Sequence, residues 1–470
     1  MSDTVIEISA LVAAPEIEQS IQQANPLTYE QDLSIARNVK IGLFNVGSAL
    51  ADLLGSGVWN RIMIADLGYP ATPISLLLGL NYFLAPLAVW TGQRSDHTYW
   101  RGYRRLPFVW GGRGLMAIGF MLLALMTVEL AETGHNIWWL GVVASLLLTS
   151  TGYVLSGSTY TTLIYERAPE HQRGRAVGVA WTMLLAGYAF SGGLTAHLLP
   201  EYSPEGLLGL FATVVALMVG LWFFSIVGEE RRHSPAEIHQ TPTPQLPPNF
   251  RDDLRMVWSN RATRLFFLYI GLSFMGAFAQ DQILEPFGGQ VFNLSTGETN
   301  RFAAFWGTTA LLGSIFALAS YRRMAQMSYA RINQIGLGIL ITTFALLAGC
   351  AFAEMESLIR PTLLFFGIGL GLWNIGTWGL MVSVSRAERA GTYFGLWTMA
   401  SLLFRGGGAV FGAALRDIAH WLGGSYAFSY GIVFALEMLV LTVALILISR
   451  LNLDFKRQVS QNEVLLAMAD

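Results

Sequence analysis

Three charged side chains interrupt apolar stretches of this sequence and are its first candidates for chemistry. Asp52, Arg113 and Arg405 each lie within a run of mostly hydrophobic residues. Charges inside an apolar span are costly and usually face a cavity or a partner. Asp52 is too short to reach an aqueous boundary, so we expect it to have a functional or a paired role, with an arginine as one partner. A long arginine can instead extend its charge to the boundary, and for Arg113 this reading is favoured.

A second polar group lies where another apolar stretch meets a proline. Gln280, Asp281 and Glu285 lie within the six residues before Pro286. Proline removes a backbone donor and breaks helices, which leaves polar groups to be satisfied. Two roles therefore stay open for these side chains: lining a central cleft, or satisfying the end of a helix that is broken at Pro286.

A third candidate is a glycine-rich run that contains Trp373, Asn374 and Trp378. Its glycines allow close backbone contact between helices, and its two indole rings offer flat apolar surfaces. Helix packing and stacking against a ring-shaped ligand stay open as alternatives. An asparagine in such a run most often donates an interhelical hydrogen bond.

The composition indicates which elements position these residues. Hydrophobic residues make up 53% of the chain and charged residues 13%, about half of the roughly 25% charged residues of soluble proteins. We therefore expect an all-α polytopic membrane protein. A net charge of −2 argues against a nucleic-acid partner. The single Cys350 excludes a disulfide framework, and the sequence contains neither HExxH nor a P-loop, so we expect no enzyme and no metal site.

Twelve apolar stretches are long enough to cross a bilayer. They are residues 41–60, 73–91, 106–128, 137–160, 176–199, 206–227, 264–284, 301–320, 333–353, 361–383, 393–415 and 425–449. Of the 29 lysines and arginines, 23 lie in the tails, the linker and the loops of one side. The loops of the other side hold only Arg61, Arg301, Arg360 and Arg416. This bias predicts that both termini are cytoplasmic.

A proline-rich polar stretch divides the twelve spans into six and six. The expected segments are a flexible cytoplasmic tail (1–37), an N-terminal half (38–228), a cytoplasmic linker (229–263), a C-terminal half (264–450) and a C-terminal cytoplasmic tail (451–470). Loops of similar sequence follow spans four and ten, each with a basic-acidic turn and then Gly-x-x-x-Gly entering a helix. Duplicated six-span halves are the architecture of the major facilitator fold.

The loop after the second span has the residues of a conformational latch. They are Gly92, Arg94, Ser95, Asp96, Arg104 and Arg105. The loop resembles the loop motif of major facilitators, although extra residues separate Asp96 from the arginine pair. We expect Gly92 to permit a tight helix end, and Asp96 to accept hydrogen bonds from arginines or from a helix N-terminus of the other half. The alternative is a charge cluster that only fixes the topology.

Five segments carry a resemblance to a known family. They are Trp59–Ala71, Arg94–Asp96, Arg104–Phe108, Gln280–Gly289 with Gly297–Thr299, and Gly391–Trp397 with Arg405–Gly408. In this order they resemble the PucC/LhaA family, the bacteriochlorophyll-delivery branch of the major facilitator superfamily. The resemblance covers roughly residues 38–450.

The resemblance implies assistance to the assembly of light-harvesting or photosystem complexes, with chlorophyll or bacteriochlorophyll handled as cargo. It implies antenna or photosystem subunits, and chlorophyll-synthesis enzymes, as partners. The membrane would be the thylakoid, intracytoplasmic or plasma membrane of a photosynthetic bacterium. Two other functions stay open: secondary transport of a small solute by alternating access, and a scaffold for assembly that carries no pigment.

A chlorophyll cargo would need an axial ligand for its magnesium and an apolar cleft for its ring. None of the seven histidines lies at the middle of a span, which argues against a histidine-ligated pigment there. Magnesium accepts oxygen ligands, and Asp52, Asn374 and Gln280 remain as candidates. The full set of candidate cavity or pigment contacts adds Asp281, Glu285, Trp373, Trp378 and Arg405.

Overall fold

The computed structural model describes residues 33–169, 172–232, 261–323, 328–384 and 390–467. The predicted tail 1–37 and the linker 229–263 fall largely outside these ranges. Throughout the described residues the regular structure is helical, with one isolated bridge between Trp100 and Tyr103. The all-α prediction is therefore confirmed.

The N-terminal half consists of the helices up to α10, each coinciding with a predicted span. They are α3 (Ile35–Asp52), continued by the π-helical η1 (Leu53–Trp59) and η2 (Ile62–Asp66); α4 (Ala71–Leu78), α5 (Leu80–Phe83) and α6 (Ala85–His97), which together form the second span; α7 (Leu106–Thr133); α8 (Trp138–Arg167); α9 (Arg173–Leu198); and α10 (Pro204–Ile226).

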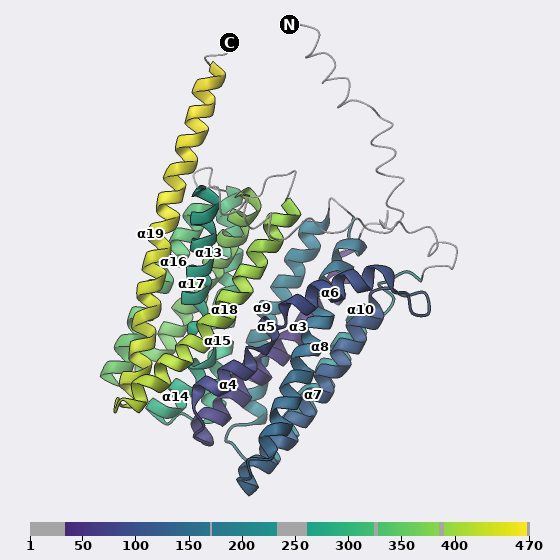
Figure 1. The fold of residues 1–470 in the computed structure, drawn as a ribbon, viewed down its shortest axis with the longest axis vertical. Helices are drawn as coiled ribbons and strands as arrows, with labels where there is room; N and C mark the ends of the chain where they lie inside the picture. The colour runs from purple at the N-terminus through teal and green to yellow at the C-terminus, as the bar shows by residue number, and fades with distance from the viewer. Residues whose placement is uncertain (1–32, 170–171, 233–260, 324–327, 385–389, 468–470) are drawn as a thin grey trace.

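The C-terminal half consists of the helices from α13 onward, which correspond to the six remaining predicted spans. They are α13 (Arg261–Phe278), the 3₁₀ turn η4 (Ala279–Gln282) and α14 (Leu284–Phe292), which together form the seventh span; α15 (Thr296–Arg323); α16 (Tyr329–Ala353); the 3₁₀ turn η5 (Glu356–Leu358); α17 (Ile359–Val384); α18 (Ala390–Trp421); and α19 (Tyr426–Ala467). α19 continues well beyond the bundle (Figure 1).

Nine helices among the described residues are long and apolar enough to cross a membrane. They coincide with nine of the twelve predicted spans. The segments outside this set are α4–α6, α13–α14 and α18; the first two are interrupted by turns. The protein is thus an integral membrane protein, and the count of twelve crossings stays a prediction.

The seventh span breaks before Pro286 rather than at it. α13 ends at Phe278, and the 3₁₀ turn η4 holds Gln280 and Asp281. Pro286 lies inside the first turn of α14. Proline is tolerated in a first turn because its missing N–H would have had no helical partner there. The expected break at Pro286 is therefore wrong by about one turn.

Among the described residues, most contacts between the two halves lie between α9 and α15 and between α4 and α18. The contact between α9 and α15 depends on glycine. A Cβ atom on Gly192 would lie 2.6 Å from the backbone nitrogen of Ala304, and one on Gly307 would lie 3.1 Å from that of Ala189. Small residues at such crossings allow backbones to approach closely in a membrane. In Figure 1 α9 and α15 lie at the centre of the molecule.

We call the end of the bundle where α3 begins the near end, and the end that carries α14 the far end (Figure 1). The bias of basic residues predicts that the near end is cytoplasmic. Reporter fusions at Ser234, which lies outside the described residues, and at the C-terminus are both expected to give a cytoplasmic signal. A fusion in the far-end loop at Gly134 should give the opposite signal. A periplasmic or lumenal signal at Ser234 would contradict the predicted orientation.

Candidate functional site

Asp52 lies where the first span changes from an α-helix to a π-helix. α3 ends at Asp52 and η1 follows directly. Within this turn the Ser56 hydroxyl donates to the Asp52 backbone carbonyl at 2.7 Å. π-helical turns are rare and are frequent at functional sites. From α9, the Tyr188 hydroxyl donates to Asp52 Oδ2 at 2.5 Å. The side-chain partner of Asp52 is thus a tyrosine and not an arginine.

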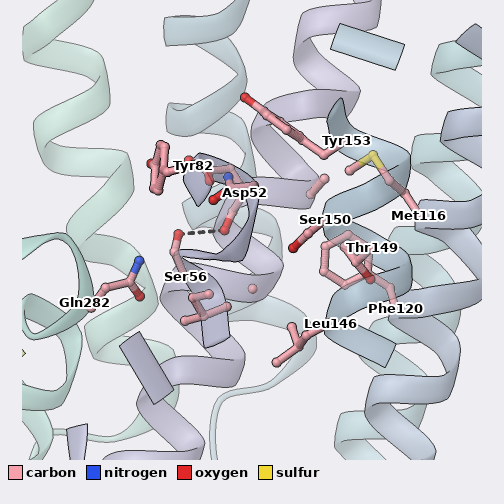
Figure 2. A pocket seen from close by; sticks show the side chains of 14 residues that line it. Asp52, Ser56, Tyr82, Met116, Phe120, Leu146, Thr149, Ser150, Tyr153 and Gln282 are labelled. Carbon is pink, nitrogen blue, oxygen red and sulfur yellow. Dashed lines mark hydrogen bonds between the residues drawn. The ribbon is translucent and has the colours of Figure 1, made fainter. Parts of the chain in front are cut away.

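A pocket opens beside this turn, with a cavity volume of about 70 Å³ (Figure 2). This cavity is smaller than a typical small-molecule site of about 300–1,000 Å³. The polar lining residues are Asp52, Ser56, Asn81, Tyr82, Thr149, Ser150, Tyr153 and Gln282, and the others are Ala51, Gly55, Leu78, Met116, Phe120 and Leu146. Gln282 comes from η4 of the C-terminal half, so the pocket lies against both halves.

An ion pair between α18 and η4 lies close to this pocket. Arg405 donates from Nε and Nη2 to Asp281 Oδ2 at 3.0 and 2.8 Å. Its guanidinium lies 4.2 Å from the Phe278 ring and 5.8 Å from the ring of Tyr82, a pocket residue. Asp52 is also within electrostatic range of Arg405. The sequence candidates Asp52, Asp281 and Arg405 therefore belong to one central polar cluster.

Two further carboxylates are enclosed in the C-terminal half. Glu285 is 6% exposed, and Glu437 on α19 is 2% exposed. Neither side chain forms an ion pair within the described residues, and both oxygens of Glu437 lack a hydrogen-bond partner there. The Gln280 side-chain oxygen is likewise buried without a partner. Glu437 was not among the sequence candidates, although a glutamate at the middle of an apolar span is a visible signal.

The glycine-rich run of α17 serves mainly for packing. Trp373 is 1% exposed, and its ring centroid lies 4.9 Å from that of Phe274. Trp378 lies 5.9 Å from Trp181 of the other half. Neither indole lines the pocket, and neither does Asn374, which is half-buried and has no hydrogen bond among those found in the described structure.

Arg113 does not reach an aqueous boundary. It is 5% exposed, and its guanidinium lies 4.3 Å from the ring of Phe44 and 4.6 Å from that of Trp222. The expectation that Arg113 snorkels is wrong, because two aromatic faces inside the N-terminal half stabilise its charge.

The loop after the second span is tied to its own half. Arg104 Nη2 donates to Glu166 Oε1 of α8 at 2.5 Å, and Arg105 Nη2 donates to the same oxygen at 2.7 Å. Arg105 Nη1 donates to Ser95 Oγ at 2.5 Å. Glu230 accepts from the backbone nitrogens of Arg104 and Arg105 where α7 begins. These contacts fix the loop to α8 and to the residues after α10.

Three other latch residues complete this loop. Gly92 does not end its helix, because α6 continues to His97 and the chain turns at Arg101 and Gly102, which have positive φ angles. The expectation of a tight helix end at Gly92 is therefore wrong. Arg94 is exposed. The side chain of Asp96 lies outside the described part of the chain, so its latch role stays a prediction.

The far end holds inter-half contacts that the sequence analysis missed. From α18, Asp417 accepts from the backbone nitrogens of Ala71 and Thr72 at 3.1 and 2.7 Å, and from the Thr72 hydroxyl at 2.6 Å. The neighbouring Arg416 donates to Asp417 and to Gln290. Gln290 in turn donates to the Ile64 carbonyl at 2.9 Å. We call this group the far-end seal.

A second part of the far-end seal is centred on Arg61, which is 4% exposed. It forms an ion pair with Asp66 of its own half. It also donates across the halves, to the Leu294 carbonyl at 2.8 Å and to Thr299 Oγ1 at 3.2 Å. The halves are thus joined by hydrogen bonds at the far end as well as by helix packing.

Comparison with known proteins then decides the family. The family model described as PUCC protein matches residues 58–455. The chain belongs to the PUCC family. The resemblance drawn from the five sequence segments is confirmed, since the match includes every one of them.

Curated relatives of this PUCC chain come from Rhodobacter capsulatus and Rhodovulum sulfidophilum. The chain is 28% identical over 412 residues to a protein of Rhodobacter capsulatus named bacteriochlorophyll synthase 44.5 kDa chain, covering 86% of this chain and 92% of the relative. It is 27% identical to protein PucC of Rhodovulum sulfidophilum, covering 82% and 86%.

Solved transporters share the fold of this PUCC chain. A bacterial homologue of the human lysosomal transporter Spinster, in an inward-facing and unoccupied conformation, matches with a TM-score of 0.63 at 15% identity. The match covers 89% of this chain and 97% of the transporter. The predicted major facilitator fold is therefore confirmed.

Proposed function

We propose that this protein handles chlorophyll or bacteriochlorophyll while light-harvesting or photosystem complexes are assembled in a photosynthetic membrane. The observation that carries the proposal is the match to the PUCC family over residues 58–455, with relatives named for PucC and for bacteriochlorophyll synthase. Antenna or photosystem subunits would receive the pigment, and chlorophyll-synthesis enzymes would supply it.

The small pocket beside Asp52 carries both apolar and polar side chains, the two kinds of group that a tetrapyrrole would contact. Met116, Phe120 and Leu146 form an apolar wall, and Asp52 and Ser56 lie among the polar residues of the same pocket. A tetrapyrrole is a flat apolar ring with a few polar groups, and burial of apolar area contributes about 25 cal/mol per Å². Apolar contacts would then supply most of the affinity, and polar groups would orient the ring.

A deletion strain tests the function. We expect deletion of the gene to lower the amount of at least one antenna or photosystem complex. The total amount of pigment synthesised per cell should stay close to that of the wild type. The complexes would be quantified by absorption of solubilised membranes separated on a density gradient, under high and low light. Normal assembly of every complex under both conditions would contradict the proposal.

Purification distinguishes the two rival functions. A small-solute transporter would purify without pigment, and its deletion would change uptake of a solute and leave the complexes intact. A pigment-free scaffold would co-purify with antenna subunits but would give no chlorophyll absorption. Pigment bound to the purified protein, together with the loss of a complex in the deletion strain, supports pigment handling.

A further inference from the structure

We infer that Glu285 is a proton-binding site, and that its proton is released when the far end of the bundle opens. Glu285 lies in the first turn of α14, at the boundary between the two halves. The site is independent of the cargo that the protein carries. It adds a second ligand, a proton, to the function proposed above, and it makes the opening of the far end depend on pH.

The first observation is that the other half of the protein covers Glu285, which is 6% exposed. Its Oε1 oxygen faces η1, since a Cβ atom on Gly57 would lie 4.0 Å from it. One turn further along α14, a Cβ atom on Gly289 would lie 2.9 Å from Arg61 Nη2 and 3.0 Å from the Cβ atom of Ala65 in η2. α14 therefore packs directly on the first span, and separation of the halves at the far end would uncover Glu285.

The second observation is that no cation balances a charge on Glu285. It forms no ion pair within the described residues, and the charged groups within electrostatic range of it are the acids Asp281 and Asp52. Arg405 is paired with Asp281 and shares the charge of Asp52. An ionised Glu285 would thus be enclosed and repelled by its neighbours, which is costly. In the closed state the residue is therefore the neutral acid.

The elements packed against α14 do not supply the missing cation. Their titratable groups at the middle and the far end of the bundle are Arg61 and Asp66 of η2, Asp281 of η4, Glu298 and Arg301 of α15, and Tyr430 and Glu437 of α19. Arg61 is paired with Asp66. Arg301 is exposed, and Tyr430 donates to Gln290. The remaining groups are acids.

The third observation favours a proton over a metal ion. The described residues hold no group of three or more side chains that could ligate a metal, and divalent cations take six or more oxygen ligands. A proton needs only one carboxyl oxygen. When the far end opens, water reaches Glu285, and a hydrated glutamate is ionised at neutral pH. The carboxyl thus binds a proton in the closed state and releases it on the far side in the open state.

Glu437 supplies a matched control. It is 2% exposed, and both of its oxygens lack a hydrogen-bond partner in the described structure. The groups beside it are the Gln280 backbone and the charge of Asp281, both in η4 of the same half. Because its surroundings belong to the C-terminal half, Glu437 stays enclosed and neutral when the halves separate.

The test follows the far end while the pH is raised. The full-length protein, purified in mild detergent, would carry spin labels at Glu205 and Glu356, which are exposed on the two halves. Release of one proton on opening raises the ratio of open to closed far ends by up to about ten-fold per pH unit. We therefore expect a longer label distance to gain population in the wild type between about pH 6 and pH 9. Glu285→Gln cannot ionise and should remove this pH dependence, whereas Glu437→Gln should keep it.

Infrared spectroscopy would detect the proton itself. The wild type should show the carbonyl band of protonated carboxylic acids, with one component that titrates over this range and one that persists. Glu285→Gln should remove the titrating component and Glu437→Gln the persistent one; elution volume and thermal midpoint report whether each variant folds. If the wild-type label distance is independent of pH, or if Glu285→Gln keeps the pH dependence or the titrating band, the assignment is overturned, whichever cargo the protein carries.

Discussion

Replacing Arg405 with methionine is expected to destabilise the protein more than any other single change at the central cluster. Methionine keeps much of the volume but removes the cation that Asp281 and Asp52 share. Removing one partner of a buried ion pair costs about 3–5 kcal/mol. The Arg405 and Asp281 side chains are 29% and 21% exposed, so we expect about 3 kcal/mol, the lower end of that range. The thermal midpoint of the purified protein in detergent would measure the loss.

The partner substitution is expected to cost less. Asp281→Asn leaves Arg405 with the face of Phe278 at 4.2 Å and with the charge of Asp52. The double variant should recover part of the loss, because it removes both charges together. The control is the exposed pair between Arg360 and Glu298, 3.9 Å apart; Arg360→Met should change stability by at most about 1 kcal/mol. Equal effects at the two pairs would contradict a structural role for Arg405.

The spans were predictable because each is a long apolar run, whereas the local breaks were not. Nine of the twelve predicted spans coincide with helices of the described structure that are long and apolar enough to cross a membrane, since burial in lipid requires about 20 apolar residues in succession. The sequence did not indicate that the first span becomes π-helical after Asp52, because a span that is apolar on nearly every face has no periodicity in which a π-turn would be visible. It also placed the break of the seventh span at Pro286, although proline fits the first turn of α14.

The charged residues of the site could be predicted from the sequence, but the side chains that pair with them could not. Asp52, Asp281 and Arg405 were identified because charges in apolar spans need compensation. Their actual partners depend on tertiary contacts. Tyr188 resembles any interfacial tyrosine in sequence, and yet it holds Asp52.

The residues of the far-end seal were visible in the sequence as exceptions. Arg61 and Arg416 are two of the few basic residues on the side that the positive-inside rule depletes, and both are 4% exposed. Both arginines entered the sequence prediction only through the bias of basic residues, so their contacts between the halves were not predicted. A basic residue that opposes the charge bias is therefore a useful marker of an inter-half contact in folds of this type.

Asp417→Ala is expected to open the far end of the bundle. α4 begins after Pro70, which has no side-chain group to cap the helix, and Asp417 of the other half accepts from the first two backbone N–H groups instead. A carboxylate at a helix N-terminus is stabilised by the helix dipole and by charge-assisted hydrogen bonds. Hydrogen bonds to a charged group contribute about 1.5–3 kcal/mol. Their loss should shift the balance between closed and open far ends about ten-fold or more.

Spin labels placed on the two halves would measure this shift. Glu205 at the start of α10 and Glu356 before α17 are exposed at the far end, and the single native thiol, Cys350, is buried and gives little background labelling. We expect one narrow distance between labels in the wild-type background and an additional, longer distance in Asp417→Ala. Glu201→Ala removes an acid that is exposed at the same end and should leave the distance unchanged. If Asp417→Ala also leaves it unchanged, helix packing between α9 and α15 is sufficient to close the far end, and the polar contacts of Asp417 only cap α4.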